Sequence, residues 1–516
     1  MITSTQLRDT AQCFGLVFLS IFFLPFSASV VCICYIVTST IPSRKLSARR
    51  HAESRGTSCQ RTVLVTGVGM AKGLALARSF YLSGHRVIGA DIEGLGAPCS
   101  GRYSRSLAAF YRLPKPSASK DAGAYANALV DIVKAENVEI WVSCSGVASA
   151  IEDAHAKELI EQHTPCKCIQ FDVRTTSLLH EKGSFMEECG KLGLPVPETH
   201  EVRSERDVLR LLSTSAASTP GRRFILKPVR MDDIHRGNMT LLPLPTKAET
   251  KQHVSKLPIS DSNPWILQQF IPGREEYCTH ALVIRGEVKC FAACPSTEML
   301  MHYKPLPPSS PLWKAMLAFT TEFVRRSPRP ETMTGHLSFD FMATEGIVNP
   351  NGFEKNIYAI ECNPRAHTAV VLFAQRGREM DAMVDAYLSA LDINPKETDK
   401  SFIGGMRLSE GTEGALITSS ANTKPRYWMG HDLPSLFLQF ALLWCRGLTN
   451  PSHFLFTIRE FALHVFFWKE GTFEIWDPLP AFVLYHISWP MAILTAWWHG
   501  KRWSRINVST MKMFSC

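Results

Sequence analysis

The sequence predicts an α/β fold for most of a chain of 516 residues. One observation behind this is that short β-branched runs alternate with segments of helix length through much of the chain. Another is the composition, since 45% apolar and 20% charged residues are ordinary values for a globular protein and exclude a largely disordered chain. The length also allows about three modules at roughly 150 residues each.

The clearest alternation opens the predicted globular part. Its elements are strands at Thr62–Thr66, His85–Asp91 and Val138–Cys144 and helices at Leu74–Leu82 and Ala124–Glu136. A strand, a helix and a second strand in this order form a βαβ unit, whose two strands are parallel. We therefore expect an open α/β domain built on a parallel sheet in this part of the chain.

A glycine-rich turn connects the first strand to the first helix. Gly67, Gly69 and Gly73 lie in or beside this turn, and Asp91 ends the next strand. Dinucleotide-binding folds place glycines and a ribose-binding carboxylate at such positions, so an NAD(P)-dependent reductase is one hypothesis. The glycine spacing is one residue longer than that fingerprint, and any tight turn of this kind favours glycine. The turn alone therefore does not decide the function.

The N-terminal region is apolar. Residues Cys13–Val37 carry no charge, and at 1.5 Å per residue they are long enough to cross a hydrocarbon core of about 30 Å. We expect a single transmembrane helix here; a signal peptide is the alternative, although its apolar part usually covers only about 7 to 15 residues. Basic residues follow at Arg44, Lys45, Arg49 and Arg50, which predicts that the rest of the chain faces the cytoplasm.

The C-terminal region is rich in tryptophan, with eight of the eleven tryptophans after residue 427. Within it, Leu479–Trp498 contains no ionisable residue except histidine and tyrosine, but Pro480 and Pro490 argue against one straight spanning helix. Tryptophans beside Lys501 and Arg502 are typical of a membrane interface. A terminal subdomain packed on the rest of the chain is the alternative.

Cysteine usage and net charge exclude some functions. Fifteen cysteines without any C-x-x-C pair suit neither a disulfide scaffold nor a cysteine-based zinc site. A net charge of +9 is modest for this length, so no nucleic-acid partner is predicted.

Four segments combine strand or turn patterns with side chains that suit nucleotide chemistry. They are LHEKGSFMEECGKLGLPVP with Lys182, RFILKP with Lys227, WILQQFIPGREE with paired glutamines and glutamates, and GHLSFDFM followed by YAIECNPRAH with Asp340, Glu361, Asn363 and Arg365. Positions 361 and 363 are two apart, so their side chains share one face of a strand. Two carboxylates and an amide oxygen are ligands suited to Mg²⁺.

In this order the four segments resemble those of the ATP-grasp ligases. Within that superfamily, FILKP, WILQQFIPGREEYCTHALV, SFDFMATEG and YAIECNPRAHTAV are similar to the mycosporine-glycine synthases, a resemblance that covers about residues 15 to 510. It implies an ATP-grasp fold preceded by a Rossmann-like domain, with ATP and Mg²⁺ as cofactors. The expected regions are a membrane anchor (1–45), a pre-ATP-grasp domain (46–175), an ATP-grasp domain (176–400) and a tryptophan-rich C-terminal region (401–516).

The resemblance also implies a role for each candidate residue. Lys182 and Lys227 match lysines that reach the ATP phosphates, Gln268, Gln269 and Ile271 match the segment facing adenine, Glu275 or Glu276 matches the ribose ligand, and Asp340, Glu361 and Asn363 match the metal ligands. Arg365 is expected to steady the transferring phosphoryl group, and His367 is a further candidate for contact with substrate.

The implied reaction activates an acid or vinylogous acid by phosphorylation and joins it to the amine of an amino acid, with 4-deoxygadusol and glycine as the family's substrate pair. The chain departs from the family at the doubled Glu275 and Glu276, at an insert near residues 349–355, and at Pro228, Arg230 and Met231. A ligase of other amino-acid-derived metabolites is therefore an alternative. An inactive nucleotide-binding scaffold is another, and the sequence predicts no oligomeric state.

Overall fold

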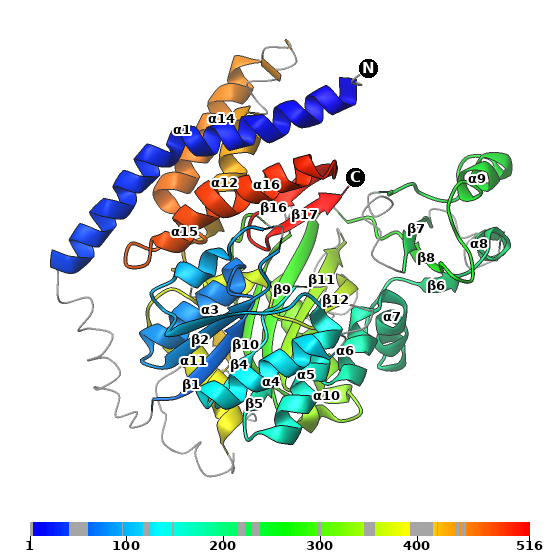
Figure 1. Ribbon diagram of the computed structural model, residues 1–516. Helices are drawn as coiled ribbons and strands as arrows, with labels where there is room; N and C mark the ends of the chain where they lie inside the picture. Colours follow the sequence, from blue (N-terminus) through cyan, green and yellow to red (C-terminus); the bar gives the residue numbers. More distant parts are fainter. Residues whose placement is uncertain are drawn as a thin grey trace.

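The computed structural model confirms the α/β class (Figure 1). It describes residues 4–40, 60–94, 96–116, 123–146, 149–213, 222–229, 238–273, 275–296, 301–344, 357–392, 416–420, 422–438, 443–444, 447 and 450–515. The predicted insert at 349–355, Arg230 and Met231, and the basic residues between 44 and 50 lie outside these ranges.

The first unit is a five-stranded parallel sheet of order β3-β2-β1-β4-β5. Its elements are β1 Thr62–Thr66, α3 Ala71–Leu82, β2 Arg86–Asp91, η1 Ser100–Tyr103, β3 Ala109–Arg112, α4 Ala124–Glu136, β4 Ile140–Val142, α5 Ala150–His163 and β5 Lys167–Ile169. The predicted strand at 138–144 is shorter in the structure, because Asn137 ends α4 in the left-handed conformation and Val138 still bonds back to Val133.

A small outer lobe follows, to one side of the molecule (Figure 1). Its antiparallel sheet has the order β6-β8-β7 and packs around buried Phe224, Trp265 and Leu267. The helices leading into the lobe and the elements of the lobe are α6 Val173–His180, α7 Lys182–Lys191, β6 Thr199–Val202, α8 Glu205–Ser213, β7 Phe224–Pro228, α9 Lys247–Val254 and β8 Trp265–Gln269.

A second five-stranded sheet of order β12-β11-β9-β10-β13 forms the centre of the molecule. Its strands are β9 Glu275–Ile284, β10 Glu287–Pro295, β11 Gly335–Ala343, β12 Ile357–Asn363 and β13 Ile417–Thr418. The helical elements between these strands are α10 Pro311–Arg326, η4 Pro330–Thr332, η6 Thr368–Leu372, α11 Arg378–Leu388 and η7 Ser389–Leu391. Phe319 of α10 packs edge-on against Phe339 and Phe341 of β11, with ring centroids 5.3 and 5.1 Å apart, and so covers one face of the sheet.

The C-terminal region packs on both sheets. It contains β14 Arg426–Tyr427, α12 Met429–Asp432, η9 Leu433–Leu438, α14 Pro451–Phe467, β15 Lys469–Glu470, α15 Leu479–Val483, η10 Leu484–Ser488, α16 Trp489–Trp498, β16 Trp503–Asn507 and β17 Lys512–Ser515. β13 pairs with β10 of the central sheet, and Arg78 of α3 forms a buried ion pair with Asp477 at 2.9 Å.

The prolines in Leu479–Trp498 do not divide this segment into separate helices. Pro480 lies in the first turn of α15, where a missing N–H removes no hydrogen bond, whereas Pro490 lies just after the π-helical η10, which joins α15 to α16. About half of the residues in its apolar stretch are buried inside the protein. Trp498 at its end is 79% exposed, so the segment has a buried and an exposed part, as both a packed subdomain and a membrane-interface segment require.

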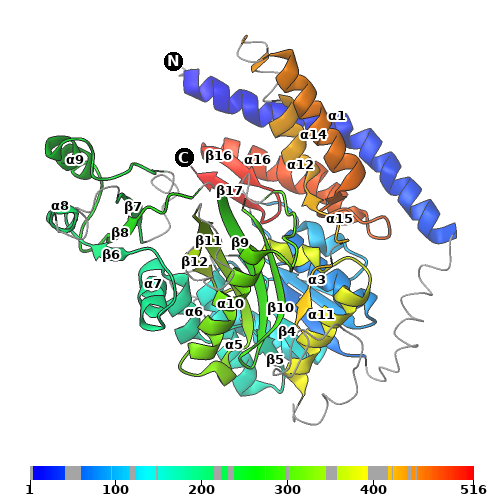
Figure 2. The same ribbon diagram turned by 180° about the vertical axis from the view of Figure 1, so that it is seen from behind.

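The N-terminal helix α1, Ser4–Thr40, has the length and composition of a membrane anchor or a signal sequence. It lies along the C-terminal helices, as both views show (Figures 1 and 2). Ser20 donates a hydrogen bond to the carbonyl of Tyr485 at 2.9 Å, and the rings of Phe14 and Trp497 meet edge-on. Its remaining surface is apolar and exposed, as at Phe18 and Phe26.

Candidate functional site

The candidate site lies on one face of the central sheet. Along β11, Leu337, Phe339 and Phe341 point into the core with α10, so Asp340 points to the opposite face. Glu361 of β12 pairs directly with Asp340 and therefore shares its face. The alternation of apolar and polar residues along β11 thus places the acidic side chains on the face away from α10.

Five of the predicted residues make contacts with one another on this face. Lys182 at the start of α7 forms an ion pair with Glu361 at 3.0 Å, and both side chains are about one-quarter exposed. Asn363 donates from Nδ2 to Asp340 Oδ2 at 3.3 Å. The amide oxygen of Asn363 accepts from Arg365 at 2.7 Å. The structure therefore brings together the residues predicted to bind a metal and one predicted phosphate-binding lysine.

Asp340 is the most perturbed acid in this group. Burial raises its pKa well above the usual value, and the charges of Glu361 and Glu276 raise it further, whereas Arg365 and Lys182 lower it. Its Oδ1 atom is buried and has no hydrogen-bond partner among the described residues. A buried carboxylate oxygen of this kind, beside a second carboxylate and an amide oxygen, fits a divalent cation such as Mg²⁺.

The outer lobe holds the second group of predicted residues. Lys227 of β7 donates to the amide oxygen of Gln268 on β8 at 3.2 Å, and Gln268 in turn donates to Thr199 at 3.2 Å. Gln269 faces the other way and accepts from the backbone N–H of Glu198 at 3.3 Å. Ile271 is buried just after the strand. Gln268, rather than Gln269, is therefore the glutamine on the side of Lys227.

The two adjacent glutamates at the start of β9 point to opposite faces. Glu276 pairs with Met342, which lies on the same face as Asp340, and its charge contributes to the raised pKa of Asp340. Glu275 accepts a hydrogen bond from Tyr277 on the other face. Only Glu276 of this pair therefore lies with the acidic cluster.

His367 is buried in the connection after β12. Its ring nitrogen Nδ1 accepts from the backbone N–H of Ala369 at 3.2 Å, and the backbone N–H of His367 donates to Nδ1 of His280 at 3.3 Å. Burial lowers the pKa of His367 well below its usual value, so its imidazole is neutral at physiological pH. These contacts are those of a residue that shapes the chain next to Arg365.

No family model matches the chain, and no curated protein matches it. Among solved structures, the chain is similar to an L-amino acid ligase from Bacillus licheniformis, at 14% identity over 64% of this chain and 74% of that chain, with a TM-score of 0.45. It is also similar to N5-carboxyaminoimidazole synthetase from Staphylococcus aureus complexed with ADP, at 13% identity over 64% of this chain and 78% of that chain, with a TM-score of 0.46. Because both likenesses are distant, the role of each residue rests on its own contacts.

Sequence reasoning missed one residue that connects the first sheet to this site. Lys72 of α3 is 2% exposed and donates to the carbonyls of Ser145 and Ala366, at 3.0 and 2.9 Å. Ala366 lies between Arg365 and His367, so Lys72 anchors the segment that carries both. A lysine next to a glycine turn gives no signal of such a distant contact in the sequence.

The glycine turn itself is closed by the protein. Asp91 accepts from the N–H of Gly69 at 2.7 Å, and the N–H of Ala71 donates to the carbonyl of Ser509 at 2.9 Å. A Cβ added at Gly101 would lie 2.0 Å from the carbonyl oxygen of Val68, so η1 packs directly on the turn. The carboxylate and one of the first N–H groups that would bind a dinucleotide are thus engaged within the chain, which argues against the reductase hypothesis.

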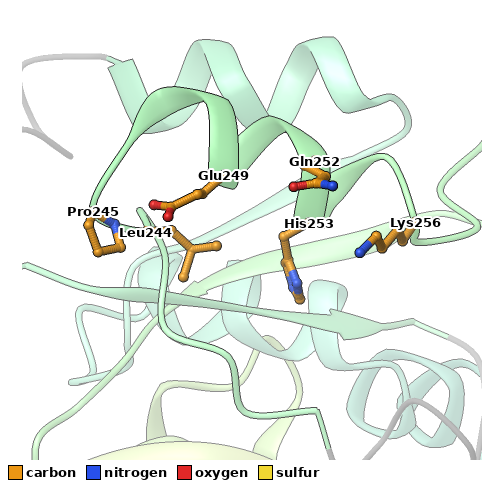
Figure 3. A pocket seen from close by; sticks show the side chains of 6 residues that line it. All are labelled: Leu244, Pro245, Glu249, Gln252, His253 and Lys256. Atoms are coloured by element: carbon orange, nitrogen blue, oxygen red, sulfur yellow. The ribbon is translucent and has the colours of Figure 1, made fainter.

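A hollow of about 340 Å³ lies on the outer lobe (Figure 3). Its lining side chains come from α9 and the residues on either side of it, namely Leu244, Pro245, Glu249, Gln252, His253 and Lys256. Glu249 is already engaged there as the capping partner of Thr246. The hollow contains none of the residues that the sequence predicts for the site.

Proposed function

We propose that the chain is an ATP-dependent ligase of the ATP-grasp type, which activates an acid by phosphorylation and joins it to an amine. The observation that carries this proposal is the polar face of the central sheet, where Asp340, Glu361 and Asn363 meet beside Lys182 and Arg365. Phosphoryl transfer from a nucleotide needs oxygen ligands for a cation together with fixed positive charges for the phosphates. The sequence resemblance to the ATP-grasp ligases supports the same conclusion.

In this proposal, Asp340, Glu361 and Asn363 would hold Mg²⁺; ATP would supply the phosphoryl group, and the ion would neutralise charge on the phosphates. Arg365 is fixed through Asn363, so its guanidinium stands beside the oxygens that bind the cation. A planar guanidinium binds phosphate oxygens in pairs, which suits it to steady the group during transfer. Lys182 supplies a further positive charge, now shared with Glu361.

We propose that the outer lobe also binds the nucleotide. Lys227 is proposed as the second phosphate-binding lysine, and Gln268, with Ile271 after it, as the segment facing adenine. Glu276 is proposed as the ribose ligand because it shares the face of Asp340, whereas Glu275 does not. His367 is proposed to position Arg365 rather than to contact substrate, because its ring nitrogen Nδ1 is engaged by its own segment.

For the substrates we propose a carboxylic or vinylogous acid and an amino acid. The support is the sequence resemblance to the mycosporine-glycine synthases, whose pair is 4-deoxygadusol and glycine. A different pair of amino-acid-derived metabolites in secondary metabolism is the alternative.

The test is Mg²⁺-dependent release of ADP and phosphate by the full-length chain in detergent. 4-Deoxygadusol is supplied with each of a panel of amino acids, and adducts are identified by mass. Release that depends on glycine, with a matching adduct, is the expected result. Release that depends on an amino acid other than glycine would support the ligase but exclude the mycosporine-glycine reaction. No release with any pair would support a nucleotide-binding scaffold.

We further propose that α1 anchors the chain in a membrane with the catalytic domains in the cytoplasm, where ATP is available. The support is the uncharged stretch Cys13–Val37 within α1 and the basic residues that follow α1 in the sequence. In sealed vesicles with the cytoplasmic face outward, added protease should remove the folded domains. Protection of those domains would contradict the orientation.

A further inference from the structure

A cluster of two histidines and one aspartate lies away from the acidic face of the central sheet. Asp432 at the end of α12 contacts Nε2 of His302 through Oδ1 at 2.7 Å and Nδ1 of His464 through Oδ2 at 2.6 Å. The three ligand-type atoms all lie within 4.8 Å of one another. They come from three separate elements, because His302 follows β10 and His464 lies in the last turn of α14.

The charge of Asp432 needs compensation. Its side chain is fully buried, and its ion-pair partners among the described residues are these two histidines, with no lysine or arginine. An isolated carboxylate is costly to bury, so a positive charge must balance it. A protonated imidazole or a bound cation supplies such a charge, and the meeting of two ring nitrogens at one carboxylate, all within 4.8 Å, suits a cation.

We propose that His302, Asp432 and His464 bind a divalent transition-metal ion, with Zn²⁺ the best match. Two imidazole nitrogens and a carboxylate are a common ligand set for zinc, whereas Mg²⁺ prefers oxygen ligands alone. Bonds of about 2.0–2.2 Å place tetrahedral ligands roughly 3.4 Å apart, so the present contacts must open by roughly 0.7 Å to admit the ion. This proposal does not depend on the proposed ligase activity.

The surroundings suit a closed structural site. The ring of His464 lies 4.2 Å from that of Trp468 and 4.5 Å from that of His302. The ring of His431 lies 5.7 Å from that of His302, which makes His431 the candidate for a fourth ligand alongside water. The side chains of His302 and His464 are only 12% and 8% exposed, so the ion would be largely shielded from solvent.

The site would join the C-terminal helices to the body of the protein. Tyr303, next to His302, bonds through its backbone to Arg426, and its ring packs edge-on against His367, with centroids 5.8 Å apart. An ion bound at His302 would therefore hold the segment against which His367 packs, as well as α12 and α14. The cluster would act on the candidate site by position, without contacting substrate.

The test measures metal content of the full-length chain, purified in detergent without chelator, by inductively coupled plasma mass spectrometry. About one equivalent of zinc, or of another divalent transition metal, is expected per chain. Removing it with EDTA should lower the melting temperature, and added Zn²⁺ but not Mg²⁺ should restore it. Metal-free wild-type protein whose melting temperature does not respond to Zn²⁺ would overturn the proposal.

His464→Gln tests the assignment to this cluster, because glutamine keeps a hydrogen-bonding group but is a poor zinc ligand. We expect the bound metal to fall at least tenfold in this variant. His499→Gln is the matched control, since His499 lies at the end of α16 outside the cluster. If the His464→Gln variant does not fold, Co²⁺ replacement in the wild type gives a second readout: visible absorption bands of a nitrogen- and oxygen-ligated ion are expected, and their absence in protein that contains one cobalt per chain would overturn the site.

Discussion

At the scale of single residues, Glu361 contacts a predicted phosphate-binding lysine and lies beside a predicted metal ligand. It forms an ion pair with Lys182 and lies opposite Asp340 across two antiparallel strands. Its carboxylate therefore contacts the ammonium group of Lys182 and is also one of the groups proposed to hold Mg²⁺. Removing its charge leaves the strand pairing intact, because the backbone of β12 makes those hydrogen bonds.

We expect Glu361→Gln to reduce ATP turnover by roughly 100-fold or more, since losing one group that stabilises the transferring charge costs about 3 kcal/mol. The measurement is ADP release at saturating Mg²⁺, with circular dichroism to check folding. Glu275→Gln is the matched control on the opposite face and should retain turnover. Normal turnover in the Glu361→Gln variant would remove the metal assignment.

The residues of the candidate site could be predicted from the sequence through its resemblance to the ATP-grasp ligases, and the two-residue spacing of Glu361 and Asn363 further predicted that these two share one face of a strand. Their partners could not. The pairing of Lys182 with Glu361 and of Lys72 with Ala366 depends on elements that are distant in the sequence. To tell which of Glu275 and Glu276 shares the face of Asp340 required the register of β9 against β11.

At the scale of elements, the turn between β1 and α3 is tightly constrained. Gly67 has a φ of +70°, and a Cβ there would lie 2.5 Å from the carbonyl oxygen of Cys144. Both the left-handed backbone and the close approach of the chain just after β4 exclude a side chain. The turn is thus a packing requirement of the sheet and needs no ligand to explain it.

We expect Gly67→Ala to destabilise the protein by about 2 kcal/mol or more, because the strained backbone and the backbone clash add. Guanidinium unfolding measures it. Gly190→Ala on α7 is the control, since nothing lies within 4 Å of the added Cβ and a helical alanine should stabilise by about 0.5–1 kcal/mol. If nicotinamide binds wild-type protein and is lost with Gly67→Ala, the reductase hypothesis returns.

Most elements were predictable because their patterns are local. The runs at β1, β7 and β8 are apolar and bounded by turns, and α4 ends at an asparagine that adopts the left-handed conformation. The continuity of α15 and α16 was not predictable from two prolines, because it depends on a π turn between them and on packing against α1.

At the scale of the whole molecule, Lys72 is buried between the two large sheets. Burial, with the nearby charge of Arg365, lowers its pKa from 10.5 to about 7. The unfolded chain holds this proton up to a pH of about 10.5, and the folded chain only up to about 7. Between these values unfolding takes up a proton, so raising the pH disfavours unfolding.

We therefore expect the free energy of unfolding to rise between pH 7 and pH 10, by up to about 1.4 kcal/mol per pH unit from Lys72. Lys72→Met should remove that part of the slope. Lys134→Met on the exposed side of α4 is the control and should keep it. Guanidinium unfolding across this pH range checks the prediction, and an unchanged slope in the Lys72→Met variant would contradict it.

The N-terminal helix α1 is synthesised long before the C-terminal helices that it packs against. Ser20 donates a hydrogen bond to Tyr485, and the first N–H of the helix that follows the glycine turn donates to the carbonyl of Ser509. At about 5 to 20 residues per second, roughly 20 to 90 s separate the emergence of Ser20 and Tyr485 from the ribosome. During that interval the apolar surface of α1 must be covered by lipid or by a chaperone, so a chain interrupted before residue 479 would leave it exposed to quality control.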